Sequence, residues 1–197
     1  MKYFCIPADF KCDSIDKICE LNDKYTDTDN KVVETYGQAS TVEINNSCRD
    51  CTLMPPVDLF QLEKYICYLK DKGLDFNYTL NPLCLGNKEL TTEGIRSIYR
   101  LLISLKNIGV DTLTITMPSL MEAVNTFDLG FNIVASAICF VDSVKKAEFY
   151  KGLGVSRIVT DPNINRNFKA LKRISGVMDG DIEVIVNNMC LKNCPTR

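Results

Sequence analysis

Three stretches of the sequence share one pattern and decide the fold: Lys72-Gly73-Leu74-Asp75, Ile108-Gly109-Val110-Asp111 and Leu153-Gly154-Val155-Ser156. In each stretch a glycine follows a helix-like segment and directly precedes an apolar one. Glycine in this place adopts the left-handed conformation that closes a helix and that other residues resist. Because the same helix-to-strand connection recurs three times, the sequence favours a regular array of βα units over an irregular mixture.

Short apolar segments alternate with amphipathic segments along the rest of the chain, which is typical of a parallel sheet covered by helices. We therefore predict a single α/β domain over residues 1–197, a parallel (β/α) TIM-like barrel of about seven strands. A complete eightfold barrel needs ~250 residues, so we expect this one to be incomplete at its carboxyl terminus by about one βα unit. The predicted strands are 3–8, 32–38, 75–81, 112–117, 133–138, 157–160 and 182–187, and the predicted helices are 14–22, 58–72, 92–108, 119–126, 143–153 and 167–177.

Composition restricts the function and the location. Lys and Arg number 23 against 25 Asp and Glu, so no excess of positive charge favours extensive nucleic-acid binding. The amino terminus reaches Asp9 before a signal-like apolar stretch has built up, and no later window is apolar enough to cross a membrane. We expect a soluble, cytoplasmic protein with no membrane partner. Histidine is absent, which excludes Ser-His and Cys-His catalytic pairs.

The alternation of side chains along the strands predicts a polar barrel interior. On strand 75–81, Phe76, Tyr78 and Leu80 suit a helix layer, which leaves the polar residues of that strand on the barrel axis. Branched apolar residues normally fill a barrel axis, and unpaired polar groups are costly there. The interior therefore holds either a structural hydrogen-bond network or a substrate site. The axis residues that we predict to bind substrate or water near the carboxyl face, and to serve catalysis, are Asn77, Asn81, Glu183 and Asn187, with Glu34, Tyr36, Gln38, Thr79 and Ile185 on the same side of their strands.

Ten cysteines are many for a chain of 197 residues. Four of them fall on helices or within the first strand, and we assign these to packing: Cys5, Cys12, Cys19 and Cys67. The other six fall at or beyond the carboxyl ends of strands, where barrel active sites lie. Two short spacings, Cys48-Arg-Asp-Cys51 in the long loop 39–57 and Cys190-Leu-Lys-Asn-Cys194, would let thiolates share a metal. The candidate ligands of an iron–sulfur cluster or zinc are Cys190 and Cys194 first, then Cys139, Cys84, Cys48 and Cys51; ordinary reduced thiols are the alternative.

Several motifs resemble the collagenase-like peptidase family, peptidase U32. They are Asp75-Phe-Asn-Tyr-Thr-Leu-Asn81, Cys84-Leu-Gly-Asn-Lys-Glu89, Leu153-Gly-Val-Ser-Arg-Ile158, Ile164-Asn-Arg-Asn-Phe168 and, most specific, Val186-Asn-Asn-Met-Cys-Leu-Lys-Asn-Cys-Pro-Thr-Arg197. The resemblance implies a TIM-barrel-like fold and either peptidase activity or, as in some relatives with a 4Fe-4S cluster, oxygen-independent hydroxylation. It implies cluster binding for Cys190 and Cys194 only; the roles of Cys48 and Cys51 depend on their predicted placement.

Three functions remain open from the sequence. The first is an iron–sulfur enzyme, or a subunit of one, that acts in an oxygen-independent hydroxylation on an unknown substrate. The second is a U32-type peptidase or hydrolase. The third is a non-catalytic binding fragment that needs a partner chain. Because an incomplete barrel leaves strand edges unpaired, we also expect a homodimer or a partner chain that completes the barrel.

Overall fold

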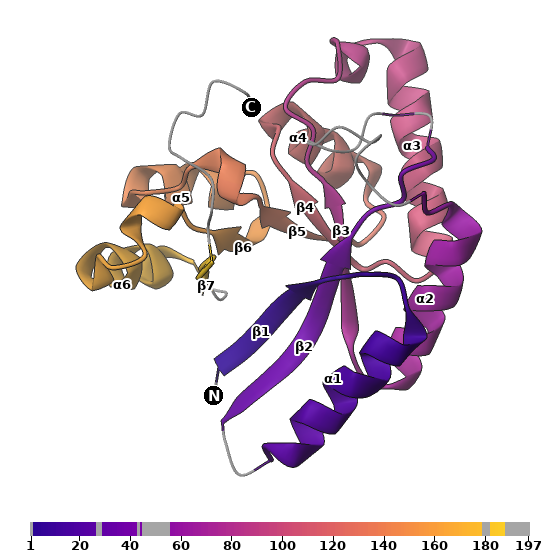
Figure 1. The fold of residues 1–197 in the computed structure, drawn as a ribbon. Helices are drawn as coiled ribbons and strands as arrows, with labels where there is room; N and C mark the ends of the chain where they lie inside the picture. Colours follow the sequence, from indigo (N-terminus) through magenta and orange to yellow (C-terminus); the bar gives the residue numbers. More distant parts are fainter. Residues whose placement is uncertain (1, 27–28, 43, 45–55, 179–181, 188–197) are drawn as a thin grey trace.

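The computed structural model describes residues 2–26, 29–42, 44, 56–178 and 182–187 (Figure 1). Its single sheet runs in sequence order, and each strand pairs with the next in parallel. This confirms the predicted α/β class and strand order. The strands are β1 (Lys2–Pro7), β2 (Asn30–Gly37), β3 (Asp75–Leu80), β4 (Thr112–Ile115), β5 (Asn132–Ala135), β6 (Val155–Val159) and β7 (Ile182–Glu183).

Helices cover the outer side of the curved sheet (Figure 1). Apolar side chains on this side of the strands pack against them: the rings of Phe76 in β3 and Tyr65 meet edge to face, with centroids 6.0 Å apart. Among the described residues, no helix is long and apolar enough to cross a membrane. The helices are α1 (Cys12–Lys24), α2 (Leu59–Asp71), α3 (Thr92–Asn107), α4 (Pro118–Phe127), α5 (Val144–Gly152) and α6 (Phe168–Val177), with short 3-10 turns η2 (Lys88–Leu90), η3 (Ala137–Cys139) and η4 (Pro162–Ile164).

The three repeated glycines close their helices as predicted. Gly73 follows α2 with φ of 73°, Gly109 follows α3 with φ of 91°, and Gly154 follows α5 with φ of 76°. All three φ angles lie in the left-handed region, where a Cβ is strained. The chain can therefore leave each helix and enter the next strand within two or three residues, which keeps the strands in sequence order.

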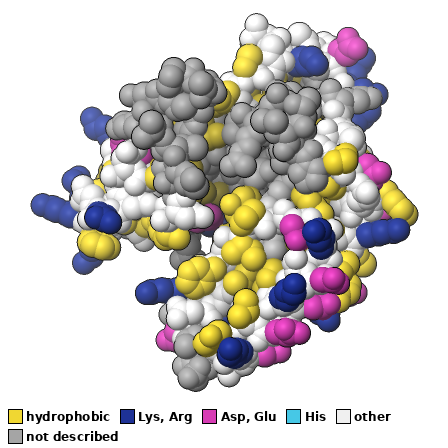
Figure 2. Space-filling model, in the orientation of Figure 1, with side chains coloured by type: hydrophobic (Ala, Val, Ile, Leu, Met, Phe, Trp, Pro, Cys, Tyr) yellow, Lys and Arg dark blue, Asp and Glu magenta, His cyan; other side chains and the backbone are white. Residues whose placement is uncertain are grey.

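The sheet is an open, TIM-like half-barrel, since β1 and β7 lie at its two ends and do not pair with each other in the described part of the chain. Apolar side chains gather over β1 in Figure 2, where Tyr3 and Phe4 are exposed by 57% and 45%. Unpaired strand edges invite association. That a second copy or another chain covers this edge stays a prediction.

Two strands end at least three residues earlier than the sequence indicated. Strand 133–138 stops at Ala135, because the Ser136 side chain accepts a hydrogen bond from the Ile138 backbone and starts the turn η3 instead. Strand 182–187 is wrong beyond Glu183. There only two residues pair with β6, and the chain then enters a turn at residues 186–187.

Both ends of the long loop 39–57 are held together. The Ser40 backbone donates to the Val57 carbonyl at 2.9 Å, and the Ser40 hydroxyl accepts from the Val57 backbone at 2.8 Å. The loop therefore leaves and re-enters the fold at one place, beside the carboxyl end of β2. Cys48 and Cys51 lie outside the described residues.

Candidate functional site

An ion pair crosses the interior of the half-barrel. Glu34 lies in β2 and Arg157 in β6, and three strands lie between these two in the sheet. One guanidinium nitrogen, Nη2, donates to both Glu34 oxygens, at 2.7 and 2.9 Å. The Glu34 side chain is 8% exposed and that of Arg157 24%. Taking two charges out of water is expensive, so this pair can persist only because each charge meets the other at hydrogen-bonding distance.

Neutral side chains extend this pair toward β4. The Asn77 amide donates to Glu34 Oε1 at 3.2 Å, and the Thr114 hydroxyl donates to Asn77 Oδ1 at 2.8 Å. Both residues are buried. Because the Glu34 carboxylate only accepts, the amide nitrogen of Asn77 must face it, which leaves Oδ1 to accept from Thr114. Asn77, one of the predicted axis residues, thus lies inside the half-barrel and holds Glu34.

Cys5 and Glu183, from the two end strands, complete the polar centre. The Cys5 thiol hydrogen-bonds to Glu34, and burial together with the carboxylates of Glu183 and Glu34 raises its pKa far above the ordinary value. The thiol therefore stays protonated. The assignment of Cys5 to apolar packing was wrong, because the residue lies on the axis side of β1, beside two carboxylates. The alternation of apolar and polar residues could not assign the two faces of β1, because nearly every residue of this strand is apolar.

Glu183 is the least satisfied group of the centre. Its Oε2 lies 3.5 Å from Arg157 Nε. Both atoms are shielded from solvent and neither has a hydrogen-bond partner. Burial raises the pKa of Glu183 above its ordinary value of 4.5; Arg157 opposes the rise and Glu34 adds to it. The centre thus combines a carboxyl group of raised pKa with an adjacent N–H group that makes no hydrogen bond.

The Cys5 sulfur and the carboxylate oxygens of Glu34 and Glu183 lie within 4.8 Å of one another, a grouping of the kind that can hold a metal ion. One observation argues against that role here: both Glu34 oxygens already accept hydrogen bonds from Arg157. The cation of this centre is the Arg157 guanidinium, whose pKa burial would lower but the two carboxylates raise.

Nearer the carboxyl face the interior remains polar. The Thr79 hydroxyl donates to Gln38 Oε1 at 3.2 Å, and the Thr116 hydroxyl donates to the main-chain oxygen of Asn81 at 3.5 Å. Asn81 is half-buried, just past the end of β3. Asn187 does not reach the axis: the strand that would have carried it inward ends at Glu183, and its side chain is exposed.

The predicted metal ligands divide into three groups. Cys139 is half-buried in η3; its thiol donates to the carbonyl oxygen of Thr116 at 3.5 Å, and burial raises its pKa to about 11. Cys84 is exposed beyond β3, and its sulfur accepts the Gly86 N–H at 3.2 Å. Cys48, Cys51, Cys190 and Cys194 lie outside the described residues.

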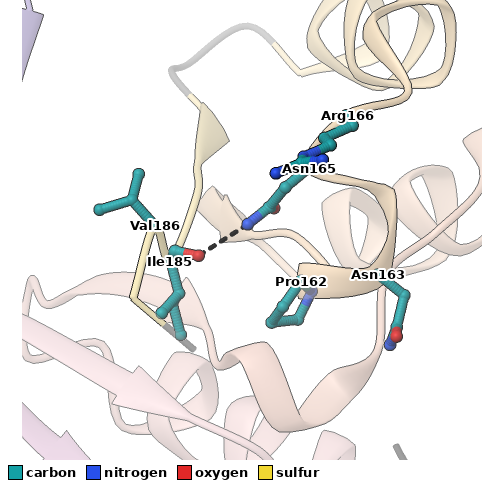
Figure 3. Close-up of a pocket in the computed structure, with 6 residues that line it drawn as sticks. All are labelled: Pro162, Asn163, Asn165, Arg166, Ile185 and Val186. Atoms are coloured by element: carbon teal, nitrogen blue, oxygen red, sulfur yellow. Dashed lines mark hydrogen bonds between the residues drawn. The ribbon is translucent and has the colours of Figure 1, made fainter. Parts of the chain in front are cut away.

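A pocket of about 330 Å³ lies between the turn after β6 and the segment that follows β7 (Figure 3). The Asn165 side chain reaches across it and donates to the Ile185 carbonyl at 2.6 Å. Ile185 is two residues beyond Glu183 in the chain. Its lining residues are Pro162, Asn163, Asn165, Arg166, Ile185 and Val186.

Fold and site together define a class of protein: an open (β/α) half-barrel with a charged axis and a pocket at the carboxyl ends of its last strands. The comparisons specify the family. The sequence model of peptidase family U32 matches residues 56–193, and the chain belongs to this family. An uncharacterized protease of Methanocaldococcus jannaschii, MJ1657, is 35% identical over 136 residues, which are 69% of this chain and 40% of the relative. The chain thus matches about two fifths of that relative.

Solved structures agree on the fold. The U32 peptidase Mk0906 superposes with a TM-score of 0.72 at 20% identity, over 93% of this chain and 68% of that one. An O-GlcNAc hydrolase mutant of Thermobaculum terrenum superposes with a TM-score of 0.60 at 8% identity, over 98% of this chain and 47% of that one. At these identities the likeness shows a shared barrel architecture.

Several site residues were not found from the sequence. Arg157 stood in an apolar strand segment, Val155-Ser-Arg-Ile-Val159, and a single basic residue there was a usable signal for a buried ion pair. Asn165 and Arg166 belong to the family-like motif Ile164-Asn-Arg-Asn-Phe168, but that motif did not indicate a pocket. Polar residues in a short turn are common, and only the tertiary fold brings this turn against Ile185.

We predict that Arg157→Met lowers the free energy of unfolding by about 2–4 kcal/mol, because Glu34 and Glu183 then face each other without a cation. The control is Lys70→Met, which removes a surface partner of Asp111 at 2.7 Å; both side chains are at least 40% exposed, and Lys106 still binds Asp111. That change should cost under about 1 kcal/mol. Urea unfolding at neutral pH measures both, and equal losses would contradict the role of the crossing pair.

The raised pKa of Glu183 predicts a pH-dependent stability. A carboxyl whose pKa is higher in the folded than in the unfolded state stabilises the fold below the unfolded value and loses this contribution as pH rises through the folded value. The stability of the wild type relative to Glu183→Gln should therefore fall as pH increases from about 4.5 upward. Parallel urea titrations of the two proteins between pH 4 and pH 8 measure the difference, and a rise with pH would refute the assignment.

Proposed function

We propose that this chain is a hydrolase of the U32 family that cleaves amide bonds of peptides, with Glu183 as the proton-transferring group. The observation that carries the proposal is the contact between Glu183 Oε2 and Arg157 Nε, which are buried, lie 3.5 Å apart as an ion pair and make no hydrogen bond. Buried polar atoms usually make hydrogen bonds. A bound group that came between these two atoms would meet one acceptor for a proton and one donor for a negative charge.

The chemistry divides between these two residues. As a carboxylate, Glu183 takes a proton from a water molecule, whose oxygen attacks the carbonyl carbon of the amide. The Arg157 Nε–H donates to the oxygen that becomes negative in the tetrahedral intermediate. When the carbon–nitrogen bond breaks, Glu183 returns the proton to the leaving nitrogen. Glu34 acts as a positioning residue, since its two oxygens hold the guanidinium in place.

Two further facts support the proposal. The Glu183 side chain is 26% exposed, although its Oε2 is shielded, and its environment raises its pKa. Raised carboxyl pKa values are a mark of groups that transfer protons near neutral pH. Two relatives, MJ1657 and Mk0906, are named as a protease and a peptidase. The lack of histidine in the chain leaves a carboxylate as a suitable base.

A second proposal concerns the cysteines: an iron–sulfur cluster, of the 4Fe-4S type, or zinc, at the carboxyl face. It is supported by Cys84, whose exposed sulfur accepts a backbone N–H, and by the family match, which includes Cys190. Thiolates are soft ligands that suit both metals. A bound cluster would supply electron transfer, and the chain would then belong with the enzymes of oxygen-independent hydroxylation. Cys139 is the weakest member of the proposed ligand set, since its thiol is protonated.

Glu183→Gln tests the hydrolase. We expect it to lower kcat/KM for short peptides or gelatin by about 100-fold or more, because the amide cannot accept the proton from water. Glu148→Gln, an exposed change of the same kind in α5, should leave the rate unchanged. Rates are measured at pH 7 on protein freed of contaminating proteases by a second purification. Cleavage of equal rate in wild type and Glu183→Gln would rule out the proposed role.

Metal analysis of anaerobically purified protein tests the cluster. We expect iron and acid-labile sulfide, or zinc, in the wild type and their loss from a Cys190→Ser, Cys194→Ser double variant. A Cys12→Ser, Cys67→Ser variant, which alters two exposed helix cysteines, is the control and should retain the metal. Equally low metal in all three proteins would remove this proposal and leave the hydrolase untouched.

A further inference from the structure

The pocket beside Ile185 contains an amide oxygen that has no partner. Asn165 Nδ2 donates to the Ile185 carbonyl at 2.6 Å, while its Oδ1 is shielded from solvent and accepts no hydrogen bond. Turning the amide over would place its oxygen against the Ile185 carbonyl oxygen, so the observed orientation is the favourable one. A buried acceptor without a donor is costly. The group that belongs here is therefore an N–H or O–H donor from outside the described chain.

The next residue adds a positive charge. Arg166 lines the same pocket, is exposed, and forms no ion pair with any other residue that the structure describes. Asn163, the other amide of the lining, is already bound: its backbone and side chain both donate to Asp161. In Figure 3 the Asn163 side chain points away from Ile185. Recognition in this pocket therefore falls to Asn165 and Arg166.

These two neighbours call for a ligand that presents a donor and an anion close together between apolar walls. The last residue of a peptide has this form, because its amide N–H and its carboxylate are joined through one carbon atom. Pro162, Ile185 and Val186 provide the apolar walls. The volume of about 330 Å³ lies at the lower end of the ~300–1,000 Å³ of small-ligand pockets, which suits a few residues of an extended chain.

We propose that this pocket binds the carboxyl-terminal end of a peptide, with the last amide N–H on Asn165 Oδ1 and the terminal carboxylate on Arg166. The inference rests on the proposed function, which it deepens by naming the substrate class. A peptide end held at Ile185 is bound two residues along the chain from Glu183. A hydrolase that holds this end would remove short pieces from the carboxyl end of its substrate.

Binding is tested without catalysis, on the full chain carrying Glu183→Gln. The probes are acetyl-alanyl-alanyl-leucine with a free carboxylate and the same tripeptide as its amide, titrated into 15N-labelled protein. We expect the free acid to bind about tenfold or more tightly than the amide. Arg166→Gln should lower the affinity for the free acid to the affinity for the amide. Asn165→Ala should lower the affinities for both probes.

Matched controls separate recognition from folding. Arg173→Gln and Lys172→Gln, two exposed changes on α6 outside the lining, should leave both affinities within about twofold. Equal binding of acid and amide by the parent, or binding of neither, would overturn the inference. Because the Arg166 side chain is exposed, thermal unfolding of its Gln variant should match the parent.

The two proposals fail separately. If the free acid binds as expected while no peptide is cleaved, the proposed peptide-binding pocket is supported and the proposed hydrolase is refuted. If cleavage depends on Glu183 but proceeds equally on acid and amide substrates, the hydrolase is supported and recognition of the terminal carboxylate is refuted. Sequential release of short carboxyl-terminal pieces from a longer peptide, followed by mass spectrometry, is the outcome that supports both.

Discussion

The ion pair between Glu34 and Arg157 is the contact on which the interior of this half-barrel depends. It joins β2 to β6 directly, although three strands separate them in the sheet. In a closed barrel, hydrogen bonding around the full circle holds the strands at their positions. An open sheet lacks that constraint. Here a charge-assisted bond across the axis ties its two halves together, and Asn77 and Thr114 hold the carboxylate that receives it.

The same pair explains why a polar centre can exist under a well-packed apolar shell. The side of the strands that faces the helices carries fully buried residues such as Tyr78 and Leu113. These contribute the burial that folding requires, so the axis side is free to hold polar groups at a cost. Arg157 satisfies Glu34 but only approaches Glu183. The desolvation cost that remains falls on the Glu183 carboxyl and raises its pKa. The proposed function uses this raised pKa for proton transfer.

Both candidate functional features lie along the strand with the fewest sheet contacts. β7 has only two paired residues, yet Glu183 belongs to it and Ile185 follows it. Its position depends on contacts from elsewhere: the Asn165 amide binds the Ile185 carbonyl, and the Thr160 backbone binds the Glu183 carbonyl at 2.9 Å. A segment held by a few polar contacts can adjust to a ligand more readily than a central strand. Glu183 therefore lies in an adaptable segment, while Arg157 is anchored by Glu34.

The α/β class, the strand order and the outer face of the sheet could be predicted from the sequence, because they depend on local rules. These rules are that glycines close helices and that apolar and polar residues alternate along strands. Asn77 and Glu183 were placed on the axis by that alternation. It failed for Cys5, whose strand is apolar on both sides, and for Asn187, whose strand ends early because only its first two residues find a partner. The pairing of Glu34 with Arg157, 123 residues away in the chain, and the pocket between Asn165 and Ile185 were decided by tertiary structure alone. Such contacts form because the curvature of the sheet brings side chains of distant strands together. No local pattern in the sequence indicates which of these side chains will meet.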